Sequence, residues 1–164
     1  MASVGESPTY RLNEGTLPLA VPEDWEDHTI NVLRVPGHGH AVTSLVVTRE
    51  NLPLGKTIGA YVQDQMQRLK RELPGFQVIA TIPILYPDQR CEAFSARWKS
   101  PDGPMEQVLC CVAIDGRRMV IFTGTNPAPM PEAMRRQILG IIAGFRPHAI
   151  GEAAVPPAAS EQIA

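Results

Sequence analysis

Side chains that could do chemistry occur in two short segments near the N-terminus. His38 and His40, in the sequence PGHGH, have imidazoles that could bind a metal ion, but no cysteine or carboxylate lies at ligand spacing beside them. The segment PEDWEDH, residues 22–28, could supply acid and base groups, although a charged turn is the simpler interpretation. Ser44 has no visible partner, and the motifs G-x-S-x-G, G-x-G-x-x-G and the P-loop are absent. We therefore predict that the protein is not an enzyme and that these histidines do not form a metal site.

The three cysteines are Cys91, Cys110 and Cys111. Their odd number and their spacing favour reduced thiols over a disulfide framework or a metal site. Cys110 and Cys111 are neighbours on a predicted strand, so their side chains should leave opposite faces of the sheet. A buried apolar role is expected for this pair, in preference to redox or nucleophilic chemistry.

Two glutamines stand where the pattern calls for an apolar side chain. Gln107 lies within the strand MEQVLCCVAI, residues 105–114, and Gln65 lies about 20° from Ile58 on a helical wheel, inside the apolar arc. A buried amide without a hydrogen-bond partner costs on the order of 1–3 kcal/mol. Each amide therefore bonds either the protein's own backbone and water, or the polar atoms of a partner in a groove. The pattern alone leaves both alternatives open.

The strand at residues 105–114 is apolar on both of its alternating faces, apart from Gln107 and Glu106. A strand that is covered on one face only should alternate apolar with polar residues. Both faces of this strand should therefore meet apolar groups. The chain's own helices can cover one face, and what covers the other is the functional question.

The spacing of apolar residues along the chain predicts which segments are strands and which are helices. Apolar residues recur at helical spacing over residues 57–73 and 131–143, and glycines follow both runs. Strands are predicted at residues 10–12, 16–21, 30–35, 41–49, 76–85, 91–99, 105–114 and 117–125. Short turns, including Asp115-Gly116, join most of them, so we predict an α+β fold with a mostly antiparallel sheet that begins as a meander. Two helices can cover one face of this sheet, or parts of two.

The length of 164 residues suits one domain with a buried core, which we place at residues 10–147. Residues 1–9 are predicted to be a disordered lead, and residues 148–164, which are rich in alanine and proline, a disordered tail. A net charge of −2 and an aromatic content of 5% disfavour nucleic-acid binding. There is no signal-peptide pattern and no run of about 18 apolar residues, so we predict a soluble, cytoplasmic protein without membrane insertion.

Five segments, in this order, resemble the DcrB-related family, and within it the Eag chaperones of type VI secretion. They are Tyr10–Pro36, SLVVTREN (44–51), YVQDQMQRLKRELPGF (61–76), MEQVLCCVAIDGRRMVIFTGT (105–125) and GFRP (144–147). Together they extend over nearly all of the predicted domain. The sequence departs from the family in its long tail after Pro147 and in its vicinal cysteines, where other apolar residues are usual.

The resemblance implies a Mog1/PsbP-like fold, in which helices flank an antiparallel sheet. It also implies a homodimer whose sheets form a concave apolar groove. The groove would hold the N-terminal transmembrane helices of a PAAR-containing effector, sometimes an Rhs effector, in the cytoplasm before secretion. The chaperone would also support loading of the effector on the VgrG spike. Such a protein is no enzyme and needs no cofactor.

The resemblance also implies client-binding residues, by position within the matching segments. These are Ile30, Val32, Gln65, Leu73 and Gln107. Alternation along the strands adds four further candidates for the same groove, and these are Leu45, Val47, Leu109 and Ile121.

Three other functions remain open on the sequence. A Mog1-like module that engages a folded protein, such as a small GTPase, would need a polar, charged recognition face. A periplasmic accessory protein of the DcrB or PsbP type would need a signal peptide. A small-molecule pocket or a weak hydrolase is the third. The apolar sheet favours the secretion chaperone over each of them.

Overall fold

The computed structural model describes residues 10–11, 16–17, 25, 28–35, 43–82 and 91–147. Strands β1 (Tyr10–Arg11) and β2 (Thr16–Leu17) form a two-stranded antiparallel sheet of their own. The expectation that the first four strands form one meander is therefore wrong, because β1 and β2 do not pair with the later strands. The predicted disordered segments, residues 1–9 and 148–164, lie outside the described residues.

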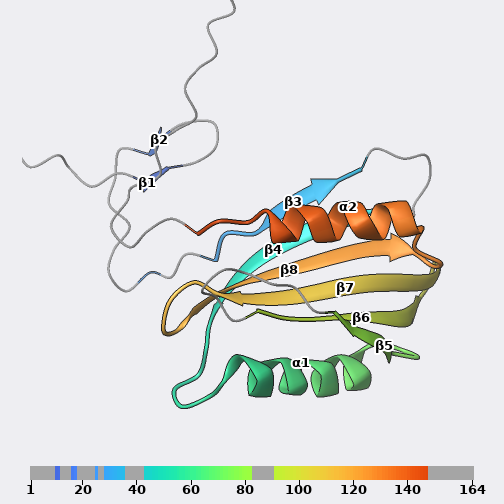
Figure 1. Ribbon diagram of the computed structural model, residues 1–164, viewed down its shortest axis with the longest axis horizontal. Coiled ribbons are helices and arrows are strands. Elements are labelled where there is room, and N and C mark those ends of the chain that lie inside the picture. The colour runs from blue at the N-terminus through green and yellow to red at the C-terminus, as the bar shows by residue number, and fades with distance from the viewer. Residues whose placement is uncertain are drawn as a thin grey trace, which may run out of the picture.

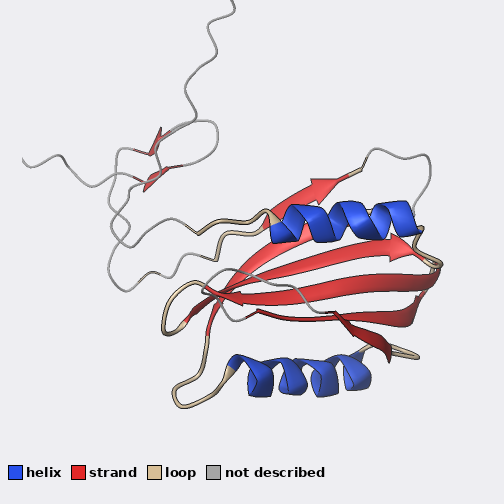
Figure 2. Ribbon diagram, viewed as in Figure 1, coloured by secondary structure: helices blue, strands red, loops and turns tan. Residues whose placement is uncertain are grey.

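The main sheet has six antiparallel strands in the order β3-β4-β8-β7-β6-β5 (Figures 1 and 2). They are β3 (Asn31–Arg34), β4 (Ser44–Asn51), β5 (Gln77–Ile82), β6 (Cys91–Ser100), β7 (Gly103–Ala113) and β8 (Arg118–Pro127). The pairing of β4 with β8 brings together segments that are far apart in the chain. The prediction of an α+β fold with an antiparallel sheet is confirmed.

Two helices cover parts of opposite faces of this sheet (Figure 1). Helix α1 (Ile58–Glu72) begins at Thr57, whose hydroxyl accepts a hydrogen bond of 3.1 Å from the amide of Ala60. Its apolar side packs with Phe94 and Leu109. Helix α2 (Glu132–Ala143) packs its apolar side on the other face. The helices therefore take the second of the two predicted arrangements.

The vicinal cysteines separate the two halves of the core. Cys110 belongs to the cluster under α2 and Cys111 to the cluster under α1, so the prediction that their side chains leave opposite faces is confirmed. Both side chains are fully buried. The strand MEQVLCCVAI, which forms most of β7, is thus apolar on both faces because a helix packs on each side of it.

Tight turns join β6 to β7 and β7 to β8. Gly103 follows the first turn. Its φ of 127° is a backbone conformation that residues other than glycine rarely adopt. The second turn is longer than the predicted Asp-Gly pair, because β7 ends at Ala113 and β8 begins at Arg118. Asp115 stabilises it by accepting hydrogen bonds from the amides of Arg117 (3.0 Å) and Arg118 (2.8 Å). These bonds lower the pKa of Asp115 to about 2.

Candidate functional site

The α1 side of the main sheet is only partly covered. Helix α1 packs on β6 and β7, whereas the part of this side formed by β3, β4 and β8 presents partly exposed side chains. Residues that pair directly across antiparallel strands share a face, so the register identifies which side chains point to this side. We call this surface the open face, and its residues are Val32, Arg34, Ser44, Val46, Thr48, Thr123 and Thr125.

The register arranges the open face in rows that run across the strands. Gln107 of β7 pairs with Thr125 of β8, and Thr125 pairs with Ser44 of β4. Ser44 pairs in turn with Arg34 of β3, so an amide, two hydroxyls and a guanidinium form one polar row. The next row contains Leu109, Thr123, Val46 and Val32. Apolar groups and hydrogen-bonding groups therefore lie next to one another on this face.

Gln107 lies at the inner end of the polar row. Its side chain is 5% exposed, and its amide makes no hydrogen bond with any residue that the structure describes. An amide in such a place gains from a partner, because the net contribution of one hydrogen bond is about 1 kcal/mol. Gln107 is therefore a candidate to bond a group that enters from the open face.

Gln65 belongs to the border of this face that α1 provides. It follows Tyr61 by one helical turn, and the Tyr61 hydroxyl donates a hydrogen bond to the Glu50 carboxylate at the end of β4. Burial and this hydrogen bond raise the pKa of Tyr61. Because residues four apart share a side of a helix, Gln65 lies on the side of α1 that points toward β4. Met66, its neighbour, instead lines a cavity next to β5.

The opposite border of the open face is the edge strand β3. Val32 is 50% exposed, and Ile30, just before the strand, is 59% exposed. Leu33 and Val35 alternate with Val32, so they point to the other side of the sheet, where they are also exposed. Edge strand β3 thus exposes apolar side chains on both faces, next to Arg34 on one face and Asn31 on the other.

The nine predicted client-binding residues are divided between the two sides of the sheet. Val32, Gln107, Leu109 and Ile121 point to the α1 side, and Gln65 and Leu73 belong to α1 and its end. Leu109 and Ile121 are buried in the cluster under α1 rather than exposed on the open face.

Leu45 and Val47 do not share this side. They pair with Gly124 and Phe122 of β8, and they pack in the cluster under α2. The prediction that they line one groove with Gln107 is therefore wrong. The alternate residues of the same strand, Ser44, Val46 and Thr48, occupy the open face instead.

Sequence reasoning missed the hydroxyl-bearing residues of the open face. Ser44, Thr48, Thr123 and Thr125 gave no signal in their own strands, because β-branched and small polar residues suit either face of a strand. The strand register identifies them instead. Once the side of the sheet that Gln107 faces is known, the pairing of β7 with β8 and of β8 with β4 shows which residues share that side.

Other candidates for chemistry gain no support from the structure. His38, His40 and the acidic residues Asp24, Glu26 and Asp27 lie outside the described residues. Within the described ranges, no three histidine, cysteine, aspartate or glutamate side chains group as metal ligands do. No helix in the same part of the chain is long and apolar enough to cross a membrane.

Comparison with known proteins shows the family of this chain. The model of the DcrB family matches residues 14–144. Effector EagT6 of Pseudomonas aeruginosa is 28% identical over 125 residues, which cover 74% of this chain and 84% of that protein. The crystal structure of PA94 from Pseudomonas aeruginosa, a protein of unknown function, superposes with a TM-score of 0.72. That similarity covers 88% of this chain and 99% of PA94 at 20% identity, so it shows the shared fold.

Proposed function

The chain belongs to the DcrB family, and we propose that it is a cytoplasmic, non-enzymatic chaperone of a type VI secretion effector. Its open face would hold the N-terminal transmembrane helices of a PAAR-containing effector, sometimes of the Rhs kind, until the effector is loaded on the VgrG spike. The similarity to Effector EagT6 supports an association with an effector. The single observation that carries the proposal is the Gln107 side chain, only 5% exposed, which lies on the same side of the sheet as the exposed Val32.

The composition of the open face suits a transmembrane helix. Such a helix exposes roughly 20 apolar residues to water before insertion. Contact with Val32, Val46 and the methyl groups of Thr123 and Thr125 would bury part of that surface, at about 25 cal/mol per Å². The hydroxyls and the Gln107 amide would bond polar atoms of the client helix, as polar side chains do between helices in membranes.

A homodimer would extend this surface. The edge strand β3 is the best-suited interface, because Ile30, Val32, Leu33 and Val35 leave apolar side chains exposed on both of its faces. Exposed apolar edges tend to pair with another chain. Two copies that join through β3 would place their open faces next to each other. Light scattering at several concentrations measures the oligomeric state.

Co-expression with an effector fragment tests the client-binding proposal. The fragment contains the N-terminal transmembrane segments and the PAAR domain, and the readout is the soluble fragment that co-purifies with tagged chaperone. Val32→Asp should reduce the co-purified fragment at least tenfold, because a charge on the open face opposes apolar contact. Ile141→Asp on α2 is the matched control, since Ile141 is 51% exposed and Val32 50%. Equal recovery with Val32→Asp and with the wild type would contradict the proposal.

Gln107→Leu separates hydrogen bonding from simple apolar contact. This variant keeps the side-chain volume and removes the amide, so it should lower retention of the fragment about fivefold, in line with about 1 kcal/mol for one hydrogen bond. The free energy of unfolding should stay the same or rise. If retention is unchanged, the amide is structural. If the effector without its transmembrane segments binds equally well, the protein is instead a module that engages a folded partner.

A further inference from the structure

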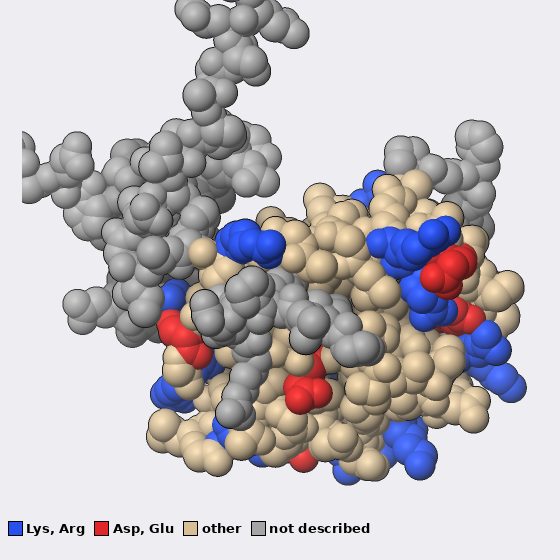
Figure 3. Space-filling view, in the orientation of Figure 1, with Lys and Arg blue, Asp and Glu red and all other residues tan. Residues whose placement is uncertain are grey.

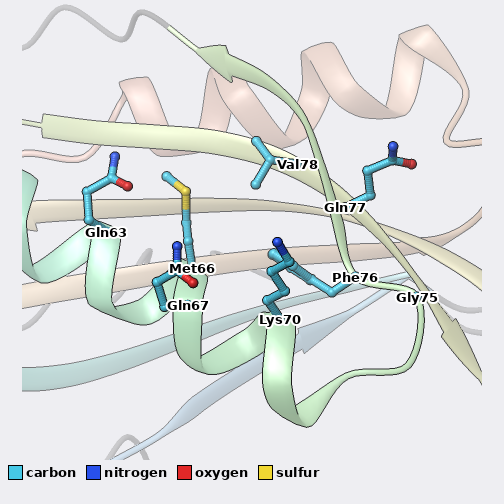
Figure 4. A pocket seen from close by; sticks show the side chains of 8 residues that line it. All are labelled: Gln63, Met66, Gln67, Lys70, Gly75, Phe76, Gln77 and Val78. Atoms are coloured by element: carbon cyan, nitrogen blue, oxygen red, sulfur yellow. The ribbon is translucent and has the colours of Figure 1, made fainter.

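A second concave surface lies on the other side of α1, between this helix and β5. It is a cavity of about 520 Å³ with an apolar base and a polar rim (Figure 4). The base contains Met66, Phe76 and Val78, and the rim contains Gln63, Gln67 and Lys70. In Figure 4, Met66 and Lys70 from α1 and Val78 from β5 project into the same space, whereas Gln77 points away. The cavity is distinct from the open face, because Gln65 and Met66 lie on different sides of the helix.

Strand β5 borders the cavity with a free edge. It is the last strand in the sheet order, so the described residues provide no strand partner for its outer side. A register shift between Val78 and Ala80 leaves Ile79 without a partner on β6, and Val78 and Ile79 are 41% and 48% exposed. Unpaired backbone groups on an edge strand can pair with an extended peptide, and pockets beside them select its side chains.

Positive charge gathers at the same end of α1. Lys70 and Arg71 lie in the last turn of the helix, and the side chain of Lys99 lies against Gly75 at the start of the loop to β5. Figure 3 shows separate Lys and Arg side chains along the lower right margin of the molecule.

The acidic residues of α1 already have partners. Asp64 binds Lys56, and Glu72 binds Arg68 at 2.9 Å. Neither Lys70 nor Lys99 forms an ion pair with the residues that the structure describes. Lys99 shares the side of β6 that carries Arg97 and faces α2, so the cavity itself is bordered by Lys70, whose charge favours a carboxylate ligand.

From this juxtaposition we propose that the cavity between α1 and β5 docks an extended acidic peptide segment of a partner protein. The peptide backbone pairs with the outer edge of β5. One apolar side chain of the peptide enters between Met66, Phe76 and Val78, and a carboxylate binds Lys70. A second copy of this chain is a poor occupant, because β5 has the sequence QVIATI, without an acidic residue, and two copies would bring their Lys70 side chains together. The site does not depend on which helix the open face holds.

Fluorescence anisotropy tests this docking site directly. The probe is a capped, fluorescein-labelled peptide of seven residues in which glutamate and valine alternate, at low ionic strength. We expect saturable binding by the full chain, at least tenfold weaker binding after Lys70→Glu, and no change after Arg136→Glu on the opposite helix. A peptide with lysine in place of glutamate should not bind. Lack of saturable binding, or equal binding of both peptides, would overturn the proposal.

Two further measurements separate specific docking from general attraction of charge. A proline at the centre of the probe removes a backbone donor and should abolish binding, and the probe should slow amide exchange in β5. If the proline peptide binds equally well, or if exchange slows elsewhere only, the attraction is non-specific and the proposal is wrong. If Val78→Lys dissolves a dimer of the protein, β5 is a self-association edge and the proposal is also wrong. Because the client assay uses Val32 and Gln107, its outcome is independent of this one.

Discussion

The two sides of the main sheet have the same strands but different coverage. Under α2, Val108, Cys110, Val112 and Ile142 are fully buried. On the α1 side, burial is complete only below the helix, and the rows toward β3 become partly exposed hydroxyls and valines. Because successive residues of a strand face opposite sides, one strand serves both surfaces. In β8, Phe122 belongs to the α2 core and Thr123 to the open face.

The position of each helix over the sheet accounts for this difference. Gly124 of β8 has no side chain, and a Cβ at that position would lie 2.7 Å from Cγ2 of Ile138, so α2 packs directly on the central strands. Helix α1 packs on β6 and β7 instead, toward the other end of the strand order, and the β3–β4–β8 part of its side stays open. The asymmetry teaches that one helix stabilises the sheet while the other also borders a binding surface.

The largest expected effect comes from adjacent substitutions in β8. Phe122→Ala should lower the free energy of unfolding by about 3–5 kcal/mol, because it leaves a cavity under α2 and removes the edge contact with Phe145, at 5.3 Å between ring centres. Thr123→Ala should lower it by less than about 1 kcal/mol, because its side chain is partly exposed. Urea denaturation measures both values. Similar losses in the two variants would mean that the open face is as much a core as the α2 side.

A buried carboxylate on the α2 side gives the next largest effect. Glu106, 4% exposed, binds Arg97 of β6 and Arg135 of α2, the latter at 2.9 Å. Burial alone would raise the pKa of Glu106, but hydrogen bonds from Arg97 and from the Met130 amide, together with the charges of Arg97 and Arg135, hold it below its usual value. Glu106→Gln should therefore lower the free energy of unfolding by about 2 kcal/mol at pH 7, by loss of charged hydrogen bonds.

The pH dependence checks the sign of this contribution. Because the pKa of Glu106 is lower in the folded chain than in the unfolded chain, its contribution is complete above the unfolded value of about 4.3. It is lost as the pH falls through the folded value. The stability difference between the wild type and Glu106→Gln should shrink under acid conditions, as measured by urea denaturation at a series of pH values. A difference that is constant with pH would mean that the carboxylate charge does not stabilise α2.

The sequence was sufficient for the elements and insufficient for their register. The strand and helix periods located α1, α2 and the six long strands, because local apolar spacing reports which residues face the core. The side chosen for β4 was wrong, since Leu45 and Val47 alternate as regularly as Val46 and Thr48 do. Only the pairing of Ser44 with Thr125 and of Thr125 with Gln107 decides which alternation faces the open side. Such pairing is non-local, and no spacing within one strand contains it.

Burial was the second quantity that spacing could not provide. Leu109 and Ile121 were predicted for the groove on alternation, and they point to the predicted side, yet they lie in the cluster with α1. Where along a face a helix lies depends on the connections at its ends and on side-chain volume, which no periodic pattern expresses. The cavity beside β5 was not predicted for the same reason, because Met66 and Val78 come together only once the position of α1 on the sheet is known.

The smallest expected effect concerns alkylation of the three cysteine thiols. Its rate at each thiol measures how well the helix on that side of the sheet shields the thiol from solvent. Cys91 is partly exposed, and the thiol of Cys110, 2.9 Å away, lowers the pKa of Cys91 by hydrogen bonding. The same bond and burial raise the pKa of Cys110, and burial raises that of Cys111 to about 12. Iodoacetamide at pH 8 should therefore alkylate Cys91 in the native protein, with little change in stability, and the other two only on unfolding.

Mass spectrometry of the peptides assigns each label, and Cys91→Ser provides the control in which native labelling should disappear. Labelling of Cys111 at the rate of Cys91 would show that α1 lifts away from the sheet in the native state. The open face would then extend beneath the helix to Leu109 and Ile121, because both lie in the cluster with Cys111. Labelling of Cys110 at that rate would instead remove the distinction between the two sides, since Cys110 lies under α2.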